Sequence, residues 1–126
     1  MPGRIVAMGG RTLLEGERPS PLLEDTLLEL SGTPAPHVVF LPTAVGDDPV
    51  RVASFEAAWS SRPGTTDVAL TFGVPDRPAE RVAQADVVVV SGGNTANMLA
   101  VWRLHGIDRA LHEVWRRGGA LGGVSA

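Results

Sequence analysis

The chain has 126 residues and a mass of 13.2 kDa, with 44% hydrophobic residues and a formal net charge of -3 at pH 7. This length and apolar content suffice for one globular domain and exclude a chain that is disordered throughout. The mildly acidic balance excludes a basic face for nucleic acid. The absence of cysteine excludes disulfides, thiolate catalysis and cysteine-ligated zinc.

The start of the chain, M-P-G-R, leads into a short apolar run that ends before Gly9. The run is too short for the apolar region of a signal peptide, and no later run approaches the length of a membrane span. We therefore expect a soluble, cytoplasmic protein with no membrane partner.

Short runs of β-branched and other apolar residues predict strands, and apolar residues at helical spacing predict helices between them. The predicted strands cover residues 4–8, 37–41, 67–72, 87–90 and the stretch from 118 to 124. The predicted helices begin at residues 20, 47, 78, 95 and 108. The first strand is apolar almost throughout, which is typical of a strand buried on both faces.

Capping residues stand at several of these helix starts. Ser20 and Asp108 are placed to cap the first and last helices, and Asn94 is placed to cap the helix that follows it. Asp47 and Asp48 suit the cap of the second helix, but they also follow the turn after the second strand, where bordering the substrate is the alternative role.

The alternation of strands and helices predicts one three-layer α/β domain over residues 1–126. Its doubly wound, mostly parallel sheet has right-handed crossovers and helices on both faces. Ligands bind such a sheet outside the carboxyl ends of its strands. Turns of small residues fall at this edge, and they make Gly10, Thr43, Gly92 and Asn94 candidate substrate contacts. For Asn94, a purely capping role is an equally good interpretation.

The final stretch, G-G-A-L-G-G-V-S-A, is an apolar run that leads to a serine between small residues. In a nucleophile elbow, G-x-S-x-G, small neighbours permit a sharp strand-to-helix turn that exposes the serine hydroxyl. Residues 123–126 match the first four of these five positions. The backbone amides of Ala126 and of Gly93, in the neighbouring turn, are candidate donors to an oxyanion formed at Ser125.

Two segments, V-V-V-V-S-G-G-N-T-A-N-M-L at 87–99 and G-G-A-L-G-G-V-S-A at 118–126, carry a resemblance to a known family. With I-V-A-M-G-G and V-V-F-L-P-T-A, they resemble the serine-peptidase family of dipeptidase E (alpha-aspartyl dipeptidase) and cyanophycinase. That family is similar in fold to the class I glutamine amidotransferases. The resemblance covers essentially the whole chain, and G-G-N-T and G-x-S-A are its most specific parts.

The resemblance implies that Ser125 is the nucleophile and that Gly93 and Ala126 form the oxyanion hole. It also implies a small peptide substrate with an N-terminal aspartate, and no metal or organic cofactor. The family's elbow continues with a glycine, and its general-base histidine and supporting acid lie beyond the elbow. We therefore expect the base to come from a segment beyond Ala126. The domain would then be incomplete at its C-terminal end, its partner would be the rest of the polypeptide, and this chain alone would be close to inactive.

The three histidines in the chain do not replace that base. His37 begins a strand, at the edge of the sheet opposite Ser125. His105 and His112 suit the surfaces of helices, where they balance the helix dipole or face solvent.

Our leading hypothesis is a serine peptidase that cleaves aspartyl dipeptides or short peptides through an acyl-enzyme on Ser125. Two alternatives stay open. One is a cyanophycinase-like hydrolase of an aspartyl polymer, and the other is a non-catalytic domain of amidotransferase-like fold that binds a small ligand or a partner. The sequence leaves the oligomeric state open, a homodimer included.

Overall fold

In the computed structural model, which describes residues 2–9 and 22–125, strands and helices alternate as the sequence predicts. The strands are β1 (Arg4–Met8), β2 (His37–Leu41), β3 (Thr65–Val68), β4 (Val87–Val90) and β5 (Ala120–Val124). The helices are α1 (Leu22–Leu30), α2 (Pro49–Trp59), α3 (Pro78–Ala83), α4 (Thr95–His105), α5 (Ile107–Arg116) and the short 3-10 helix η1 (Thr43–Val45). No helix in these described ranges combines the length and the apolar character needed to cross a membrane.

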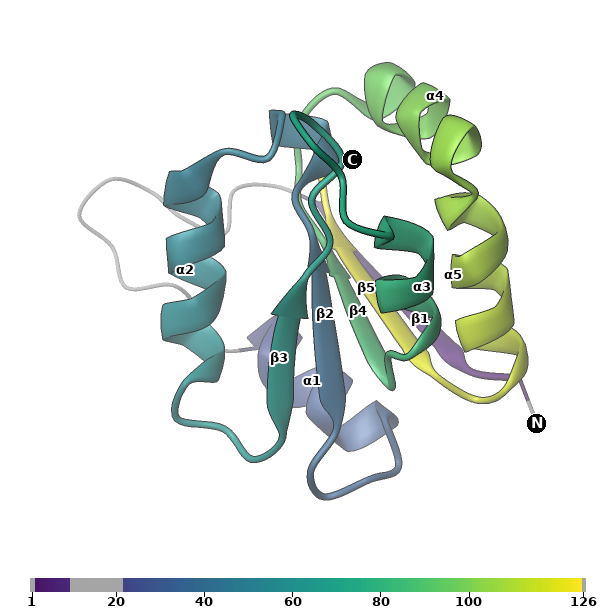
Figure 1. Ribbon diagram of the computed structural model, residues 1–126. Helices are drawn as coiled ribbons and strands as arrows, with labels where there is room; N and C mark the ends of the chain where they lie inside the picture. Colours follow the sequence, from purple (N-terminus) through teal and green to yellow (C-terminus); the bar gives the residue numbers. More distant parts are fainter. Residues whose placement is uncertain (1, 10–21, 126) are drawn as a thin grey trace.

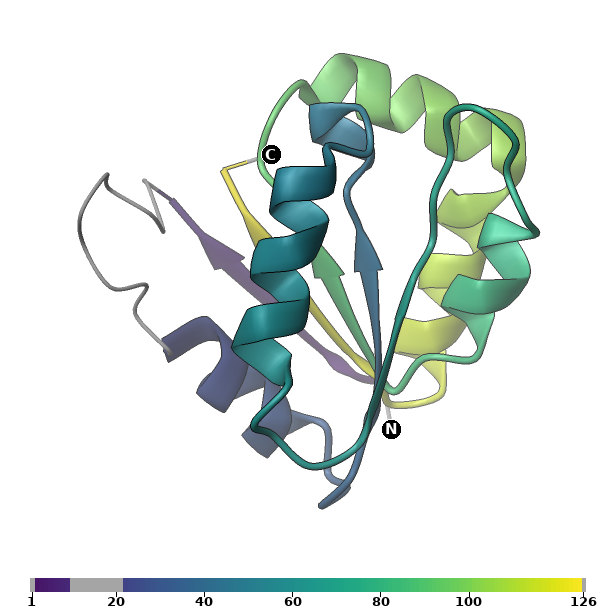
Figure 2. The ribbon, with the colours of Figure 1, turned by 60° about the vertical axis from the view of Figure 1, so that its left-hand side comes forward.

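The strands form one parallel sheet in the order β1-β5-β4-β2-β3 (Figure 1). Helices α1 and α2 cover one face of this sheet, and α3, α4 and α5 cover the other (Figure 2). The predicted fold class, a three-layer α/β sheet, is confirmed. Because all the strands point the same way, their carboxyl ends share one edge of the sheet.

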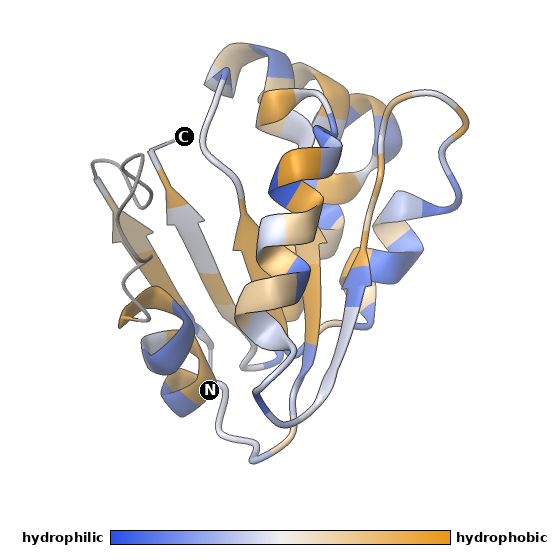
Figure 3. Cartoon of the chain, turned by 90° about the vertical axis from the view of Figure 1, so that its left-hand side faces the viewer, coloured by the Kyte–Doolittle hydropathy of each residue, from blue (hydrophilic) through white to orange (hydrophobic). Residues whose placement is uncertain are grey.

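The central strand β4 contributes to both hydrophobic cores. Val87 and Val88 are fully buried, and successive side chains of a strand point to opposite faces. Val87 therefore packs with the residues under α1 and α2, and Val88 packs with those under α3 to α5. Burial on both faces explains why this strand is a continuous run of valines, which Figure 3 shows in its hydrophobic colour.

Glycines on and beside β5 let helices approach the sheet closely. A Cβ atom built on Gly122 would lie 2.5 Å from a methyl carbon of Leu27 on α1. A Cβ built on Gly119 would lie equally close, 2.5 Å, to a methyl carbon of Val114 on α5. The space that these two residues leave empty is therefore filled by helix side chains from opposite faces.

The third strand ends earlier than the predicted range of 67–72. The Ala69 amide still donates to the Phe40 carbonyl of β2 at 3.0 Å. Beyond it, the carboxylate of Asp47 accepts the amides of Thr71 and Phe72 at 2.7 and 2.8 Å. These two amides bind a side chain instead of a neighbouring strand, so the chain leaves the sheet.

The prediction that the first strand is buried on both faces is wrong. β1 is an edge strand that pairs only with β5 among the described strands, and Ile5 on it is 67% exposed. Only Val6 and Met8, on the other face, pack against the core under α1. An apolar run of this length does not by itself distinguish an edge strand from a central one.

The structure confirms one of the predicted helix caps described here and contradicts another. Asp48 caps α2 by accepting the Val50 amide at 3.0 Å, whereas Asp47 points to the segment after β3. Asp108 does not cap α5, because that helix begins directly after Gly106, whose backbone is left-handed. The Ser20 cap lies outside the described residues.

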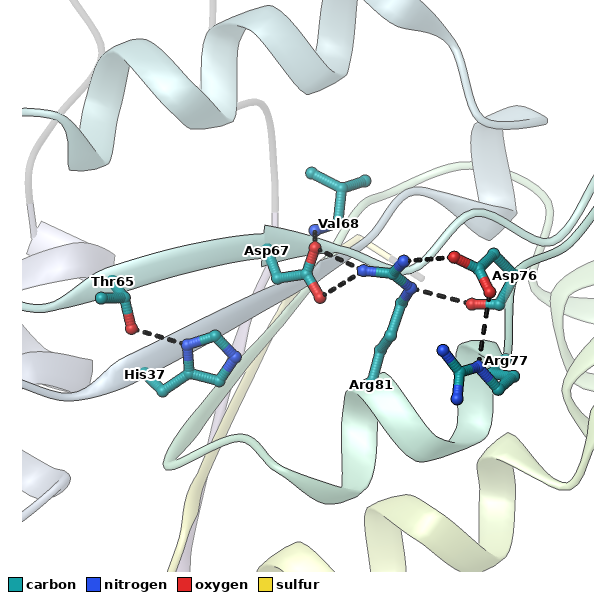
Figure 4. A network of polar contacts seen from close by, with 7 residues as sticks. All are labelled: His37, Thr65, Asp67, Val68, Asp76, Arg77 and Arg81. Atoms are coloured by element: carbon teal, nitrogen blue, oxygen red, sulfur yellow. Dashed lines mark hydrogen bonds and ion pairs between the residues drawn. The ribbon is translucent and has the colours of Figure 1, made fainter.

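An ion-pair network lies at the edge of β3 that pairs with no other described strand (Figure 4). Arg81 on α3 binds the carboxylates of Asp67 at 2.8 Å and Asp76 at 2.6 Å. Hydrogen bonding and charge from Arg81 lower the pKa of Asp76 below its usual value. Asp67 also accepts the amide of Val68, which is then unable to recruit another strand to this edge. The network thus ties β3 and the segment after it to α3.

Gly122→Ala should lower the free energy of unfolding by about 1–3 kcal/mol, because the new methyl group overlaps the Leu27 side chain. Gly123→Ala is the matched control, since its Cβ would lie 3.6 Å from the nearest atom, an ordinary contact with Val90. Urea denaturation of the two variants measures the difference. Equal stabilities would contradict the close packing of α1 on β5.

Candidate active site

Ser125 directly follows β5 at the carboxyl edge of the sheet, and it is exposed. Its φ angle is 60°, in the left-handed region that residues other than glycine seldom adopt. Its amide donates to the Met8 carbonyl of β1 at 2.9 Å, which fixes the backbone on that side. A strained backbone at an exposed serine after a strand is one feature of a nucleophile elbow.

The turn after β4 lies against Ser125. A Cβ atom built on Gly92 would be 2.8 Å from the Val124 carbonyl oxygen and 3.3 Å from the Ser125 Cβ. The register agrees, because Val90 at the end of β4 pairs with Gly123 near the end of β5. No larger residue than glycine fits at position 92 without displacing the backbone that holds Ser125.

Gly93, the candidate oxyanion donor, is exposed and has a φ angle of 138°. A side chain here would overlap the Ala44 carbonyl and would lie 3.0 Å from a methyl carbon of Val45, both in η1. Within residues 2–9 and 22–125, the Gly93 amide donates no hydrogen bond. It is therefore a donor without a partner in the described part of the chain, and it lies in the turn that contacts Ser125 through Gly92.

Asn94 is the N-cap of α4, as predicted. Its side-chain oxygen accepts the Asn97 amide at 3.0 Å, and its own amide donates to the Ala44 carbonyl at 2.8 Å. Both groups therefore hold the turn in place, which favours the capping interpretation of Asn94 over a direct substrate contact.

Thr43 does not fit the substrate contact expected from its turn. It is only 2% exposed, and its hydroxyl accepts the indole N–H of Trp102 at 3.0 Å. A buried indole N–H needs such an acceptor, so the hydroxyl is already used inside the protein. Thr43 joins η1 to α4 from within and leaves no side chain for substrate.

Two other predicted residues, Gly10 and Ala126, lie outside the described residues. Of the candidate residues, Ser125, Gly92, Gly93 and Asn94 gather at one place.

The histidines lie away from this place. His37 is at the amino end of β2, where its ring bonds to the Thr65 hydroxyl at 2.7 Å (Figure 4). His105 ends α4, about 16 Å along the helix axis from the Asn94 cap. His112 is exposed on α5 and packs its ring against Trp115. Among the described residues, no three histidine, aspartate or glutamate side chains gather in a way that could hold a metal ion.

Sequence reasoning placed Ser91 and Asp47 in turns at this edge but missed what their side chains do. Ser91, between β4 and Gly92, is 9% exposed, and its hydroxyl has no hydrogen-bond partner among the described residues. Asp47 binds two amides that lie 24 and 25 positions away. Local sequence gives no signal for either feature, because one depends on burial and the other on a distant partner.

Thr43→Val should lower the free energy of unfolding by about 1–3 kcal/mol, because it leaves the Trp102 indole without its acceptor at nearly constant volume. Ser91→Ala should leave stability unchanged or raise it, because it removes an unpaired buried hydroxyl. Chemical denaturation with comparison of midpoints and slopes measures both. A loss in Ser91→Ala as large as in Thr43→Val would show that the Ser91 hydroxyl has a structural partner.

A family model described as peptidase family S51 matches residues 5–126. The uncharacterized peptidase YgaJ of Bacillus subtilis (strain 168) is 34% identical over 125 residues, a match that covers 98% of this chain and 54% of YgaJ. The chain thus spans about half the length of this curated relative.

Solved structures show a similar fold. A peptidase from an acI-B1 Actinobacterium has a TM-score of 0.69 at 20% identity, covering 99% of this chain and 55% of its own. A putative peptidase E from Listeria monocytogenes EGD-e has a TM-score of 0.64 at 21% identity, covering 83% of this chain and 54% of its own. The likeness to these two structures supports the predicted fold class, an α/β sheet like that of class I glutamine amidotransferases.

Proposed function

Since the chain belongs to peptidase family S51, we propose that it carries the nucleophile of a serine peptidase, the hydroxyl of Ser125. The observation that best supports this role is the left-handed backbone of Ser125 at the carboxyl edge of the sheet, in contact with the turn at Gly92. Strain of this kind amounts to about 1–3 kcal/mol and is concentrated at functional sites.

In the proposed reaction, the Ser125 oxygen attacks the carbonyl carbon of the scissile bond while a histidine base takes the hydroxyl proton. The carbonyl oxygen becomes an oxyanion, and the amides of Gly93 and Ala126 stabilise its charge. Collapse of this intermediate breaks the C–N bond, and the histidine returns the proton to the leaving amine. Water then hydrolyses the serine ester.

We further propose that the base belongs to a segment corresponding to the half of the relatives that this chain does not match. No described histidine lies beside Ser125, and a serine hydroxyl without a base is a weak nucleophile. On this proposal, the rest of the polypeptide is the partner that completes the site, and the present chain alone has little activity.

The proposed substrates are dipeptides or short peptides with an N-terminal aspartate, and the proposed location is the cytoplasm. The support for this specificity is the resemblance of G-G-N-T and G-V-S-A to the dipeptidase E motifs. An aspartyl polymer remains the alternative substrate. Parallel assays on an aspartyl dipeptide and on the polymer distinguish the two.

Ser125→Ala in the full polypeptide should lower kcat/KM for an aspartyl chromogenic amide by about 10⁴-fold or more, because the acyl-enzyme has no atom on which to form. A fluorophosphonate probe should add its mass to the wild type and not to this variant. Ser54→Ala, on the exposed surface of α2, is the matched control and should label normally. Equal turnover by Ser125→Ala would end the proposal, and an unlabelled wild type would favour a non-catalytic domain.

A further inference from the structure

Asp47 joins three segments that meet near the candidate site. It lies between η1 and α2, and its φ angle of 59° places it in the left-handed region. Its neighbour Asp48 forms the cap of α2. The carboxylate of Asp47 is therefore not needed for the helix, and it binds elsewhere.

The carboxylate fixes the chain where it leaves β3. One oxygen accepts the amides of both Thr71 and Phe72, at 2.7 and 2.8 Å, and the other lies 3.4 Å from the Thr71 hydroxyl. Thr71 is itself only 5% exposed. Hydrogen bonds to an ionised acceptor are stronger than neutral ones, so this contact holds the two segments firmly together.

The segment after β3, which Asp47 binds at Thr71 and Phe72, is also held at its other end, at Asp76. Arg81 on α3 fixes Asp76 there, because it binds the Asp76 carboxylate at 2.6 Å and the Asp76 carbonyl at 2.8 Å (Figure 4). The chain after β3 is thus held at both ends, and it offers Asp47 a fixed point of attachment.

The backbone of Asp47 closes the turn that contains η1. Its amide donates to the Pro42 carbonyl at 3.0 Å, beside the bond from the Gly46 amide to the Thr43 carbonyl, also 3.0 Å. Aspartate and asparagine tolerate the left-handed backbone that this closure requires. Side chain and main chain of Asp47 together fix η1 against the segment after β3.

The turn after β4, which carries the candidate oxyanion donor Gly93, packs directly against η1. The Ala44 carbonyl accepts the Asn94 amide at 2.8 Å, and Gly93 packs against the same carbonyl without room for a side chain. The position of the Gly93 amide therefore depends on where η1 holds Ala44. Gly92, one residue earlier, contacts Ser125.

We infer that Asp47 is a positioning residue: its carboxylate fixes η1 and, through Ala44, the amide of Gly93 beside Ser125. This inference rests on the proposed function, because it concerns the oxyanion donor of that reaction. Oxyanion-hole amides stabilise the transition state because they are already in position when the negative charge develops on the substrate oxygen. Displacing such an amide by about 1 Å costs about 100-fold in rate. Asp47 itself touches no reacting atom.

Asp47→Ala should lower kcat of the full polypeptide about 10–100-fold with little change in KM, and it should slow fluorophosphonate labelling per folded molecule. It should also speed hydrogen exchange of the Asn94 amide, because the Ala44 carbonyl is no longer held. Asp47→Asn retains one acceptor oxygen and tolerates the same backbone, so it should restore most of both properties and remains testable where Asp47→Ala does not fold.

Asp48→Ala is the matched control. It removes the cap of α2 one residue away, so it should destabilise the protein while leaving labelling per folded molecule and Asn94 exchange unchanged. Unchanged Asn94 exchange in Asp47→Ala, or an equal effect of Asp48→Ala, would overturn the inference even where Ser125→Ala abolishes labelling. Because amide exchange needs no catalysis, it decides the role of Asp47 independently of whether Ser125 is the nucleophile.

Discussion

The close approach of backbone to backbone at Gly92 and Gly93 is the constraint on which the candidate site depends. On one side, this turn meets the Val124 carbonyl at the end of β5, and on the other it meets the Ala44 carbonyl of η1. A methyl group at either glycine would separate these three segments. The end of β5, the turn at Gly92 and Gly93, and η1 are therefore in contact because two side chains are absent.

The strand order brings these segments to one place. β5, β4 and β2 are adjacent in the sheet, so Ser125, the glycine turn and η1 follow three neighbouring strands at the same edge. β1 and β3 flank them and hold the outer sides. Met8 accepts the Ser125 amide from one flank, and the segment after β3 binds Asp47 from the other. Each strand of the sheet thus contributes to the position of the site.

The sequence predicts the parts of this arrangement that depend on local pattern. The valines of β4, the Asn94 cap and the gathering of small-residue turns at one edge all follow from periodicity, capping chemistry and parallel strands. The parts that it does not predict depend on distant partners. Thr43 is buried against Trp102, and the chain leaves the sheet after β3 where Asp47 accepts the amides of Thr71 and Phe72. The edge position of β1 depends on strand order, which an apolar run does not encode.

The pairing of β1 with β5 has a consequence for biosynthesis. Arg4 and Ala120 are partners in the sheet although more than a hundred positions separate them in the chain. Closing so long a loop is slow compared with forming local helices and turns. During translation, β1 therefore waits for β5 to leave the ribosome before the amide of Ser125 reaches Met8. The backbone turn at Ser125 is thus among the last features of residues 2–125 to form, because one of its hydrogen bonds needs both β1 and β5 in place.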